Sequence, residues 1–393
     1  MDIRQPIGYL APSPLVNSGY GRHVRNIVTR SKKFGGNPIV FGNQHFGDNL
    51  NYNGIVVTPR LNHPYLADIL PYLVQKYSTK LVVNMWDFWA MDYLADVKKL
   101  LDFKYIHWIP CDCILKPESV TEANMKVLKE AEKIFSVSQF STQQFKNLGF
   151  DAVYIPIGID SEIYRPMQNK KELKKKYGFP EDSFVIGFVG KNISTRKGIS
   201  ELMQAVKIFK EGLPESERSK IKLYLHTDRE PSAGNSFDLV RMGKFYGIQD
   251  IILFPSVHMG MESYDDATMA DIYNCMDVFA STSKGEGFNA PLLEALSCGL
   301  PIVAHSTTAH IELMEDTDSI GVMSSNFKEM PLWTNLITEY ETVDAGAFAM
   351  GLHYIWTKTP EERIEMGKRG RKKAETFTWD DSYRRFITEL ERL

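Results

Sequence analysis

The sequence predicts an α/β protein with two domains, each containing a parallel sheet covered by helices on both faces. Short apolar runs recur along the chain, and most are followed by a loop and an amphipathic segment, the pattern of successive strand–helix units. The 393 residues are also too many for one ordinary core. Because the composition turns basic in the middle of the chain and the sheet pattern then restarts, we place the domain boundary near residue 165.

The first domain, residues 1–165, is expected to begin with a strand. Its strands are expected at 6–10, 38–41, 54–57, 80–84, 104–109, 132–137 and 153–155. Its helices are expected between the first strand and residue 33, at 64–76 and at 139–148. Gly19 and Gly21 follow the first strand, where glycines let the backbone approach a ligand, although a plain surface loop is the alternative.

Aromatic and titratable side chains stand near two strand ends of the first domain. Trp86, Phe88 and Trp89 follow the fourth expected strand and suit either stacking on a sugar or lipid-like acceptor or packing beneath a loop. His107 lies within the fifth strand and Asp112 follows it. A lone histidine inside an apolar strand is usually a core residue, so His107 alone does not identify a site.

The second domain, residues 166–376, repeats the pattern. Its strands are expected at 184–190, 221–226, 251–254, 277–280, 301–304 and 320–322. Its helices are expected between the first of these strands and residue 210, at 265–275, at 291–298, and from residue 333 to the end of the chain. The last segment, 377–393, is an amphipathic helix that we expect to pack back toward the first domain.

Three cations occupy the loop that follows the first strand of the second domain. These are Lys191, Arg196 and Lys197. Arginine supplies a fork of donors and lysine a point charge, so this loop, next to a helix N-terminus, is suited to cradle a diphosphate. The loop lacks the Gly-Lys-[Ser/Thr] ending of a Walker loop, so hydrolysis of ATP or GTP is not indicated.

The stretch 283–304 combines a loop, a helix and a strand in one βαβ unit. Pro291 suits the first turn of the helix and Gly299 its C-terminal cap. Glu286 lies in the loop and Glu294 inside the helix. Two carboxylates therefore stand at the carboxyl edge of a sheet, beside a helix N-terminus that favours anions, and a phosphate-bearing ligand is expected there.

The bulk composition limits the partners and the compartment. A formal net charge of −3 gives no general reason to expect nucleic acid. The few cysteines lie in apolar segments and predict a reducing compartment; they are Cys111, Cys113, Cys275 and Cys298. With no secretory leader and no apolar run of about 18 residues, we expect a cytoplasmic protein or one on the membrane surface facing the cytoplasm. The lysine-rich stretch 170–176 suits either contact with anionic lipid or simple solvation.

Several motifs together resemble a known family. The segment from Glu286 through Glu294, followed by 298–304, resembles the Glu-x7-Glu signature of retaining glycosyltransferase family 4, the group 1 glycosyltransferases. Further segments resemble this family in the expected order, at 19–21, 136–148, 156–160, 190–198, 273–278 and 377–380. The resemblance implies the GT-B architecture, in which two Rossmann-like domains face each other across a cleft.

The resemblance also implies how a donor, a UDP- or GDP-sugar, is bound without a metal or another cofactor. Glu286 would bind hydroxyl groups of the donor sugar, and the same sugar would be held by the backbone around Gly287, Phe288 and Asn289. Glu294 would bind the ribose of the nucleotide.

For the diphosphate, the resemblance implies neutralisation by Lys191, Arg196 and Lys197, with Gly19 and Gly21 closing on it from the other domain. Negative charge builds on the leaving diphosphate during transfer, so preorganised cations lower the barrier. Retention in such enzymes is ascribed to attack from the front face, in which the departing phosphate oxygen helps to remove the proton of the acceptor. No protein nucleophile is then required.

The sequence departs from the family at the catalytic partner in the first domain. The family often has a histidine just after a strand, near the sugar. Here His107 lies within the strand and Asp112 follows it, so both are candidates.

The predicted function is transfer of a hexose from a nucleoside diphosphate sugar to a hydroxyl group of a sugar, a lipid-linked sugar or a protein, with retention of configuration. The alternative is a non-catalytic subunit of a glycosylation complex that binds a sugar nucleotide; such a subunit would be expected to lose a phosphate cation or one of the two glutamates. A nicotinamide oxidoreductase is a third hypothesis, but neither half has a full Gly-x-Gly-x-x-Gly with its later acidic residue.

Overall fold

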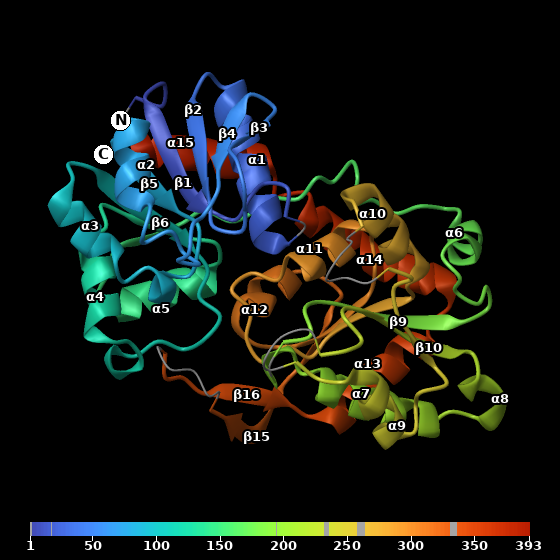
Figure 1. Cartoon of the computed structure of the whole chain (residues 1–393). Coiled ribbons are helices and arrows are strands. Elements are labelled where there is room, and N and C mark those ends of the chain that lie inside the picture. The colour runs from blue at the N-terminus through green and yellow to red at the C-terminus, as the bar shows by residue number, and fades with distance from the viewer. Residues whose placement is uncertain (1, 17, 194, 232–235, 258–263, 331–335) are drawn as a thin grey trace. The chain divides into compact units, whose positions relative to one another are not determined.

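The computed structural model describes residues 2–16, 18–193, 195–231, 236–257, 264–330 and 336–393, and its contacts divide the chain into two compact units (Figure 1). The first unit comprises Met1–Gly158, Leu332–Thr338 and Phe377–Leu393, and the second comprises Ile159–Pro331 and Glu339–Thr376. Each unit contains a parallel sheet covered by helices, which confirms the predicted α/β class.

The sheet of the first unit has eight strands in the order β3-β4-β2-β1-β5-β6-β7-β8. Neighbouring strands are parallel except for β3 and β4, which are antiparallel. The strands are β1 Pro6–Ala11, β2 Asn37–Gly42, β3 Leu50–Tyr52, β4 Ile55–Thr58, β5 Leu81–Asn84, β6 Lys104–Ile109, β7 Ile134–Ser136 and β8 Ala152–Tyr154. Every strand expected in this half is present, and the short edge strand β3 is an addition.

The helices of the first unit are α1 Gly19–Lys33, α2 Leu70–Lys76, α3 Leu94–Leu100, α4 Glu122–Lys129, α5 Gln139–Asn147 and α15 Trp379–Glu391, with 3-10 turns η1 Phe88–Ala90 and η2 Pro117–Ser119. Residues of α2, α3 and α4 share one apolar core with the sheet, and α15 lies beside α1 (Figure 1). Helix α2 begins later than the expected residue 64. The Asp68 carboxylate accepts the backbone N–H groups of Asn62 and His63, which holds that stretch as a turn.

The sheet of the second unit has six strands, all parallel, in the order β11-β10-β9-β12-β13-β14. They are β9 Phe184–Val189, β10 Ile221–His226, β11 Ile252–Leu253, β12 Val278–Ser281, β13 Ile302–His305 and β14 Ile320–Val322. From β9 the chain builds outward through β10 and β11, and it then returns to place β12 on the other side of β9. The strand order therefore reverses between β9 and β12.

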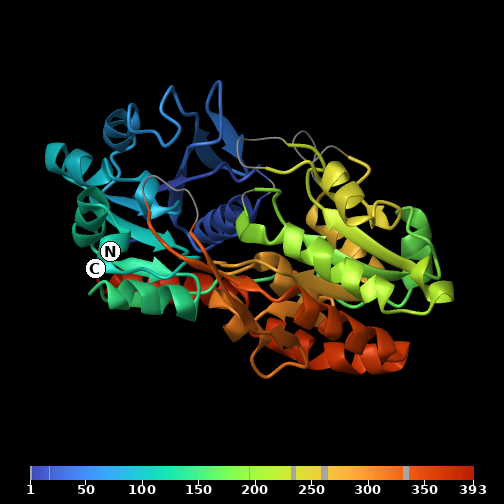
Figure 2. The same ribbon diagram turned by 90° about the horizontal axis from the view of Figure 1, so that it is seen from below.

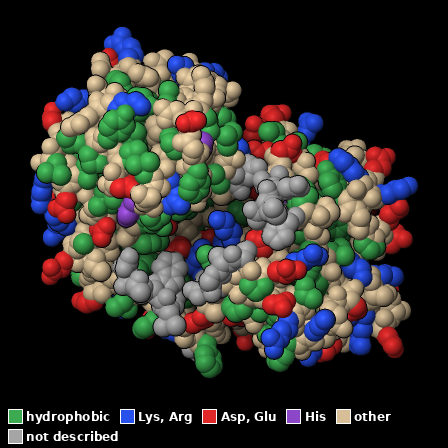
Figure 3. Space-filling view, in the orientation of Figure 1, with side chains coloured by type: hydrophobic (Ala, Val, Ile, Leu, Met, Phe, Trp, Pro, Cys, Tyr) green, Lys and Arg blue, Asp and Glu red, His purple; other side chains and the backbone are tan. Residues whose placement is uncertain are grey.

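Two helical layers enclose this sheet, as Figure 1 shows. One layer consists of α7 Ile199–Glu211, α9 Leu239–Tyr246 and α13 Ala345–Thr357, and Figure 2 shows α7 beside α13. The other layer contains α6 Lys170–Lys176, α10 Asp266–Cys275, α11 Ala290–Ser297, α12 Thr308–Met314 and α14 Pro360–Ala374; a short helix α8 spans Glu215–Arg218. Acidic and basic side chains are interspersed over the face of this unit seen in Figure 3.

The second unit begins seven residues before the boundary expected from composition, after Gly158 instead of near residue 165. Tyr164 explains this, because its ring packs edge-on against Tyr273. Its carbonyl oxygen also accepts hydrogen bonds from Ser297 Oγ and Arg371 Nη1. The segment before residue 165 is thus bound to α10, α11 and α14.

An antiparallel hairpin replaces part of the helix expected from residue 333. Its strands are β15 Ser324–Glu329 and β16 Tyr340–Val343. Tyr340 and Val343, at the two ends of β16, are buried, while Glu341 is exposed. The prediction of helix is therefore wrong for residues 336–344, and α13 begins at Ala345 under the cap of Asp344; Trp333 lies outside the described residues.

Candidate functional site

The reversal of strand order between β9 and β12 marks the place where open α/β sheets bind ligands, outside the carboxyl ends of the strands. The loop after β9 carries the three predicted cations, and the loop after β12 carries Glu286. The two loops therefore meet at the switch point of the second sheet. This places a turn that carries two cations next to a carboxylate.

The buried Glu286 side chain contacts two of the cations, Arg196 and Lys197, which are themselves partly buried. Its Oε1 atom lies 2.5 Å from Lys197 Nζ, and its Oε2 atom lies 3.3 Å from Arg196 Nη1. Burial alone would raise the pKa of Glu286, but the charges of Lys197 and Arg196 outweigh it and lower this pKa to about 2. Glu286 is therefore ionised throughout the physiological pH range.

The cationic turn, η3 Thr195–Lys197, is held by the loop that carries Glu286. Gly198 ends the turn with φ +62°, and a Cβ atom there would lie 2.2 Å from the carbonyl oxygen of Thr282, so only glycine fits. The Thr282 hydroxyl donates to the Gly198 carbonyl at 2.7 Å. Arg196 Nη1 donates to the Gly285 carbonyl at 2.6 Å.

The loop after Glu286 leads into α11 through an unusual residue. Asn289 adopts the left-handed conformation with φ 70°, which asparagine tolerates better than most residues. Its Oδ1 atom accepts from the N–H group of Leu292 and caps α11. Its Nδ2 atom donates to Nε2 of His310 at 2.6 Å. Gly287 and Phe288 are buried in the same loop.

Glu294 lies inside α11 and is also buried. Its Oε2 atom accepts a hydrogen bond of 2.8 Å from the hydroxyl group of Tyr273. Lys191 differs from the other predicted residues of this unit, because its side chain is exposed in the loop after β9. The structure thus brings together Glu286, Arg196 and Lys197, and it places Glu294 and Lys191 on the neighbouring helix and loop.

The sequence interpretation missed the residues that support this loop from β13 and α12. His305 Nδ1 bonds to the Ser283 carbonyl at 3.0 Å, and His310 Nδ1 bonds to the His305 carbonyl at 2.8 Å. The hydroxyl group of Thr308 accepts the N–H group of Glu286 at 2.9 Å. Their signal in the sequence was a polar stretch directly after a strand.

In the first unit, Gly19 and Gly21 open helix α1. Ser18 caps this helix by accepting the N–H group of Gly21. A Cβ atom at position 21 would lie 2.0 Å from the Val16 carbonyl oxygen, whereas one at position 19 would meet no atom within 4 Å. Position 21 therefore requires glycine because the backbone of Val16 lies close to it, whereas Gly19 is exposed at the start of the helix.

The two other candidates of the first unit lie at β6. His107 is fully buried, and burial lowers its pKa to about 4. Its Nδ1 atom accepts from Asn84 Nδ2 at 2.9 Å, which leaves Nε2 to donate toward the Val127 carbonyl at 3.4 Å. Asp112 is half-buried in the loop after the strand. Both ring nitrogens of His107 are therefore engaged within the first unit.

Aromatic side chains gather after β5 in the same unit. The ring of Trp86 lies 4.8 Å from that of Tyr20, whose hydroxyl group donates to Asp87 Oδ1 at 2.6 Å. Phe88 is fully buried, and Trp89 packs edge-on against it. Trp86 and Trp89 stay half-buried.

The described residues contain neither a metal-binding cluster nor a membrane-spanning helix. No group of three or more His, Cys, Asp or Glu side chains in these ranges is arranged to hold a metal ion. Within the same residues, every helix is too short or too polar to span a bilayer.

Comparison with known proteins identifies one matching family model and several relatives. Residues 183–330 match the family model described as glycosyl transferases group 1. D-inositol 3-phosphate glycosyltransferase of Stackebrandtia nassauensis is 28% identical over 293 residues, covering 70% of this chain and 62% of that protein. The enzyme of the same name from Mycobacterium tuberculosis is 24% identical over 286 residues, covering 70% and 53%. The chain thus matches less than two thirds of the length of these relatives.

Solved structures resemble the whole chain in fold. Sucrose-phosphate synthase of Thermosynechococcus elongatus superimposes with a TM-score of 0.78 at 17% identity, covering 99% of this chain and 98% of that one. HepE of Anabaena, solved in complex with UDP-glucose, gives a TM-score of 0.76 at 17% identity, covering 99% and 100%. The two-domain fold predicted from the motifs is therefore confirmed.

Proposed function

Because residues 183–330 match the family model of the group 1 glycosyltransferases, we propose that this chain transfers a hexose from a nucleoside diphosphate sugar to an acceptor hydroxyl group, with retention and without a metal. One observation carries this proposal above the others. Arg196 and Lys197 meet Glu286 at the switch point of the second sheet, next to the start of α11.

The charges of this cluster suit the leaving group. Negative charge accumulates on the diphosphate as the bond to the sugar breaks, and cations fixed in advance stabilise it at little reorganisation cost. Arg196 and Lys197 are such cations, because the turn that carries them is held at Gly198 and at Gly285. Lys191, exposed in the same loop, adds a further positive charge for the phosphates.

Glu286 has a different role in this proposal. With a pKa of about 2 it carries no proton to donate, so it acts as a hydrogen-bond acceptor for sugar hydroxyl groups and not as a general acid. Glu294, oriented by the hydroxyl of Tyr273, is assigned to the ribose. The acceptor proton would pass to the departing phosphate oxygen, so the mechanism needs no protein nucleophile.

Substrates to test first follow from the relatives. UDP-glucose is bound by the HepE structure, and D-inositol 3-phosphate is named as the acceptor of the bacterial relatives. A thermal-shift series with UDP-, GDP- and ADP-sugars identifies the donor, because a ligand at a hundred times its Kd stabilises the folded state by about 2.7 kcal/mol.

The variants Glu286→Gln and Lys197→Met test the assignment. Each should reduce transfer or donor hydrolysis by about a hundredfold or more, since each removes a preorganised charge from the donor site. Lys207→Met is the matched control, because Lys207 is partly exposed on α7 and its Nζ atom lies 4.0 Å from Glu211, a weak pair outside the donor site. Wild-type rates in both site variants would refute the proposal. Donor binding by the wild type without hydrolysis or transfer to any acceptor would favour the non-catalytic subunit.

A further inference from the structure

A second charged cluster lies directly beside the cationic turn. Lys284 is only 3% exposed, and its ammonium group lies 2.8 Å from Glu201 Oε1 on α7. The same ammonium group also contacts Glu329 Oε2, at the end of β15. Because a buried ammonium group is costly without partners, these two carboxylates are strongly held in place.

The Lys284 cluster, which consists of Lys284, Glu201 and Glu329, forms hydrogen bonds to the cationic turn at two points. The Thr195 hydroxyl, in the first residue of the turn, donates to Glu329 Oε1. The backbone N–H group of Lys284 donates to the Arg196 carbonyl at 2.7 Å. One contact reaches the turn from the hairpin, and the other reaches it from the loop after β12.

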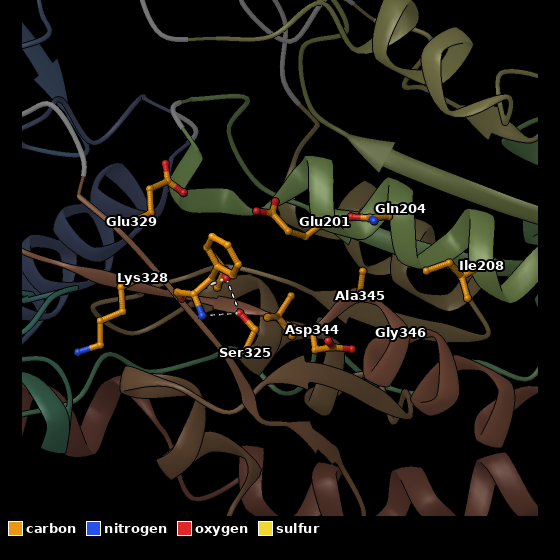
Figure 4. A pocket seen from close by; sticks show the side chains of 12 residues that line it. Glu201, Gln204, Ile208, Ser325, Lys328, Glu329, Asp344, Ala345 and Gly346 are labelled. Atoms are coloured by element: carbon orange, nitrogen blue, oxygen red, sulfur yellow. Dashed lines mark hydrogen bonds between the residues drawn. The ribbon is translucent and has the colours of Figure 1, made fainter.

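The hairpin and α7 leave a hollow between them near these contacts. A cavity of about 610 Å³ is lined by residues of α7 and of β15–β16, and Glu201 and Glu329 both border it (Figure 4). Figure 4 also shows the amine of Lys328 directed away from both carboxylates. Val343 of β16 shares one apolar core with α7, whereas the end of β15 at Glu329 is joined to α7 through the ion pairs of Lys284.

We propose that Glu329 and Lys284 are positioning residues, which tie the β15–β16 hairpin to the cationic turn and fix Arg196 and Lys197 for the diphosphate of the donor. This inference rests on the proposed function for the identity of the ligand. The charges of the two clusters balance, with Arg196, Lys197 and Lys284 against Glu286, Glu201 and Glu329. Loss of Glu329 leaves Lys284 with one carboxylate and Thr195 without its acceptor.

Titration of the full chain with UDP and with GDP tests the effect on binding. Glu329→Gln and Thr195→Val should raise the Kd of whichever nucleotide binds by between about tenfold and a hundredfold, because a small displacement of the cations costs that much. Thr195→Ser keeps the hydroxyl group and should restore binding. Glu339→Gln is the matched control, since Glu339 pairs with Lys328 on the exposed side of the same hairpin. A lower melting temperature with an unchanged Kd would make Glu329 merely structural and overturn the inference.

Hydrogen–deuterium exchange without nucleotide separates this inference from the proposed function. Glu329→Gln should accelerate exchange of the amides at 195–198 and of Lys284, and leave those of β9 and β12 unchanged. Unchanged exchange at 195–198 would overturn the inference whatever the enzyme binds. A wild type that binds neither UDP nor GDP would instead contradict a UDP- or GDP-sugar as the donor, while faster exchange at the turn would still support the contact between the hairpin and the turn.

Discussion

At the scale of single residues, Thr308 of the second unit combines a strained backbone with a hydrogen bond to Glu286. It has φ 45°, in the left-handed region that β-branched residues strongly avoid. Such strain costs about 1–3 kcal/mol and persists only where the surroundings fix it. Here the hydroxyl group of Thr308 accepts the backbone N–H group of Glu286, so the strained residue fixes the backbone of the residue whose carboxylate contacts both cations.

Two substitutions of Thr308 separate strain from positioning. Thr308→Gly relieves the strain but removes the hydrogen bond, so its stability should stay within about 1 kcal/mol of wild type while kcat/KM for the donor falls about tenfold. Thr308→Ser keeps the hydroxyl group and should keep most of the activity. Urea unfolding and donor kinetics measure the two effects. Wild-type kcat/KM in Thr308→Gly would show that the contact is dispensable.

Residue types and strand ends were enough to select Glu286, Arg196 and Lys197, because the carboxyl ends of parallel strands share one edge. They were not enough to find Thr308, Lys284 or Glu329. The hydrogen bonds of these three residues join segments 22 to 134 residues apart. No local sequence pattern shows which polar side chain of one loop contacts a residue of another loop.

At the scale of elements, helix α6 shows how a charge pattern can mislead. Its lysines were interpreted as a solvated face or a contact for anionic lipid. Lys170 and Lys174 instead lie 2.8 and 3.2 Å from the carboxylate of Asp277, just before β12, and Lys174 is buried. Burial would raise the pKa of Asp277, but the two lysines outweigh it and lower this pKa.

Lys174→Met should therefore destabilise the second unit by about 2–4 kcal/mol, because it removes one partner of a buried carboxylate. Lys171→Met is the control, since Lys171 is exposed on the same helix and should change stability by less than about 0.5 kcal/mol. Urea denaturation of both variants measures the difference. Equal stability of the two would mean that Asp277 needs only Lys170.

Most strands were predictable because parallel strands buried on both faces are short continuous apolar runs. The hairpin β15–β16 was not, since β15 has the polar sequence Ser-Ser-Asn-Phe-Lys-Glu and no apolar alternation. Strands β15 and β16 are separated in the sequence by an intervening segment. Whether two such strands pair depends on the fold around them.

At the scale of the whole molecule, the first unit is discontinuous in sequence. Its last segment, α15, brings Phe386 onto Trp108 with ring centroids 4.8 Å apart and Trp379 onto His23 at 5.8 Å. A Cβ atom at Gly158 would lie 2.2 Å from the backbone nitrogen of Trp379, so the two chain segments touch directly. The amphipathic pattern of 379–393 predicted a buried face; its exact partners are long-range contacts that the pattern does not contain.

Because the cluster of Glu286, Arg196 and Lys197 belongs to the second unit, folding of the first unit and binding of the nucleotide should respond to different substitutions. Phe386→Ala leaves a cavity against Trp108 and should cost about 3–5 kcal/mol of stability. Measured well below the melting temperature, its Kd for the nucleotide should stay within about twofold of wild type, since no group of that cluster is changed. Phe245→Ala, at a side chain 81% exposed on α9, is the control for a loss of aromatic area without a cavity. A tenfold weaker Kd in Phe386→Ala would instead mean that the core around α15 contributes to the shape of the donor site.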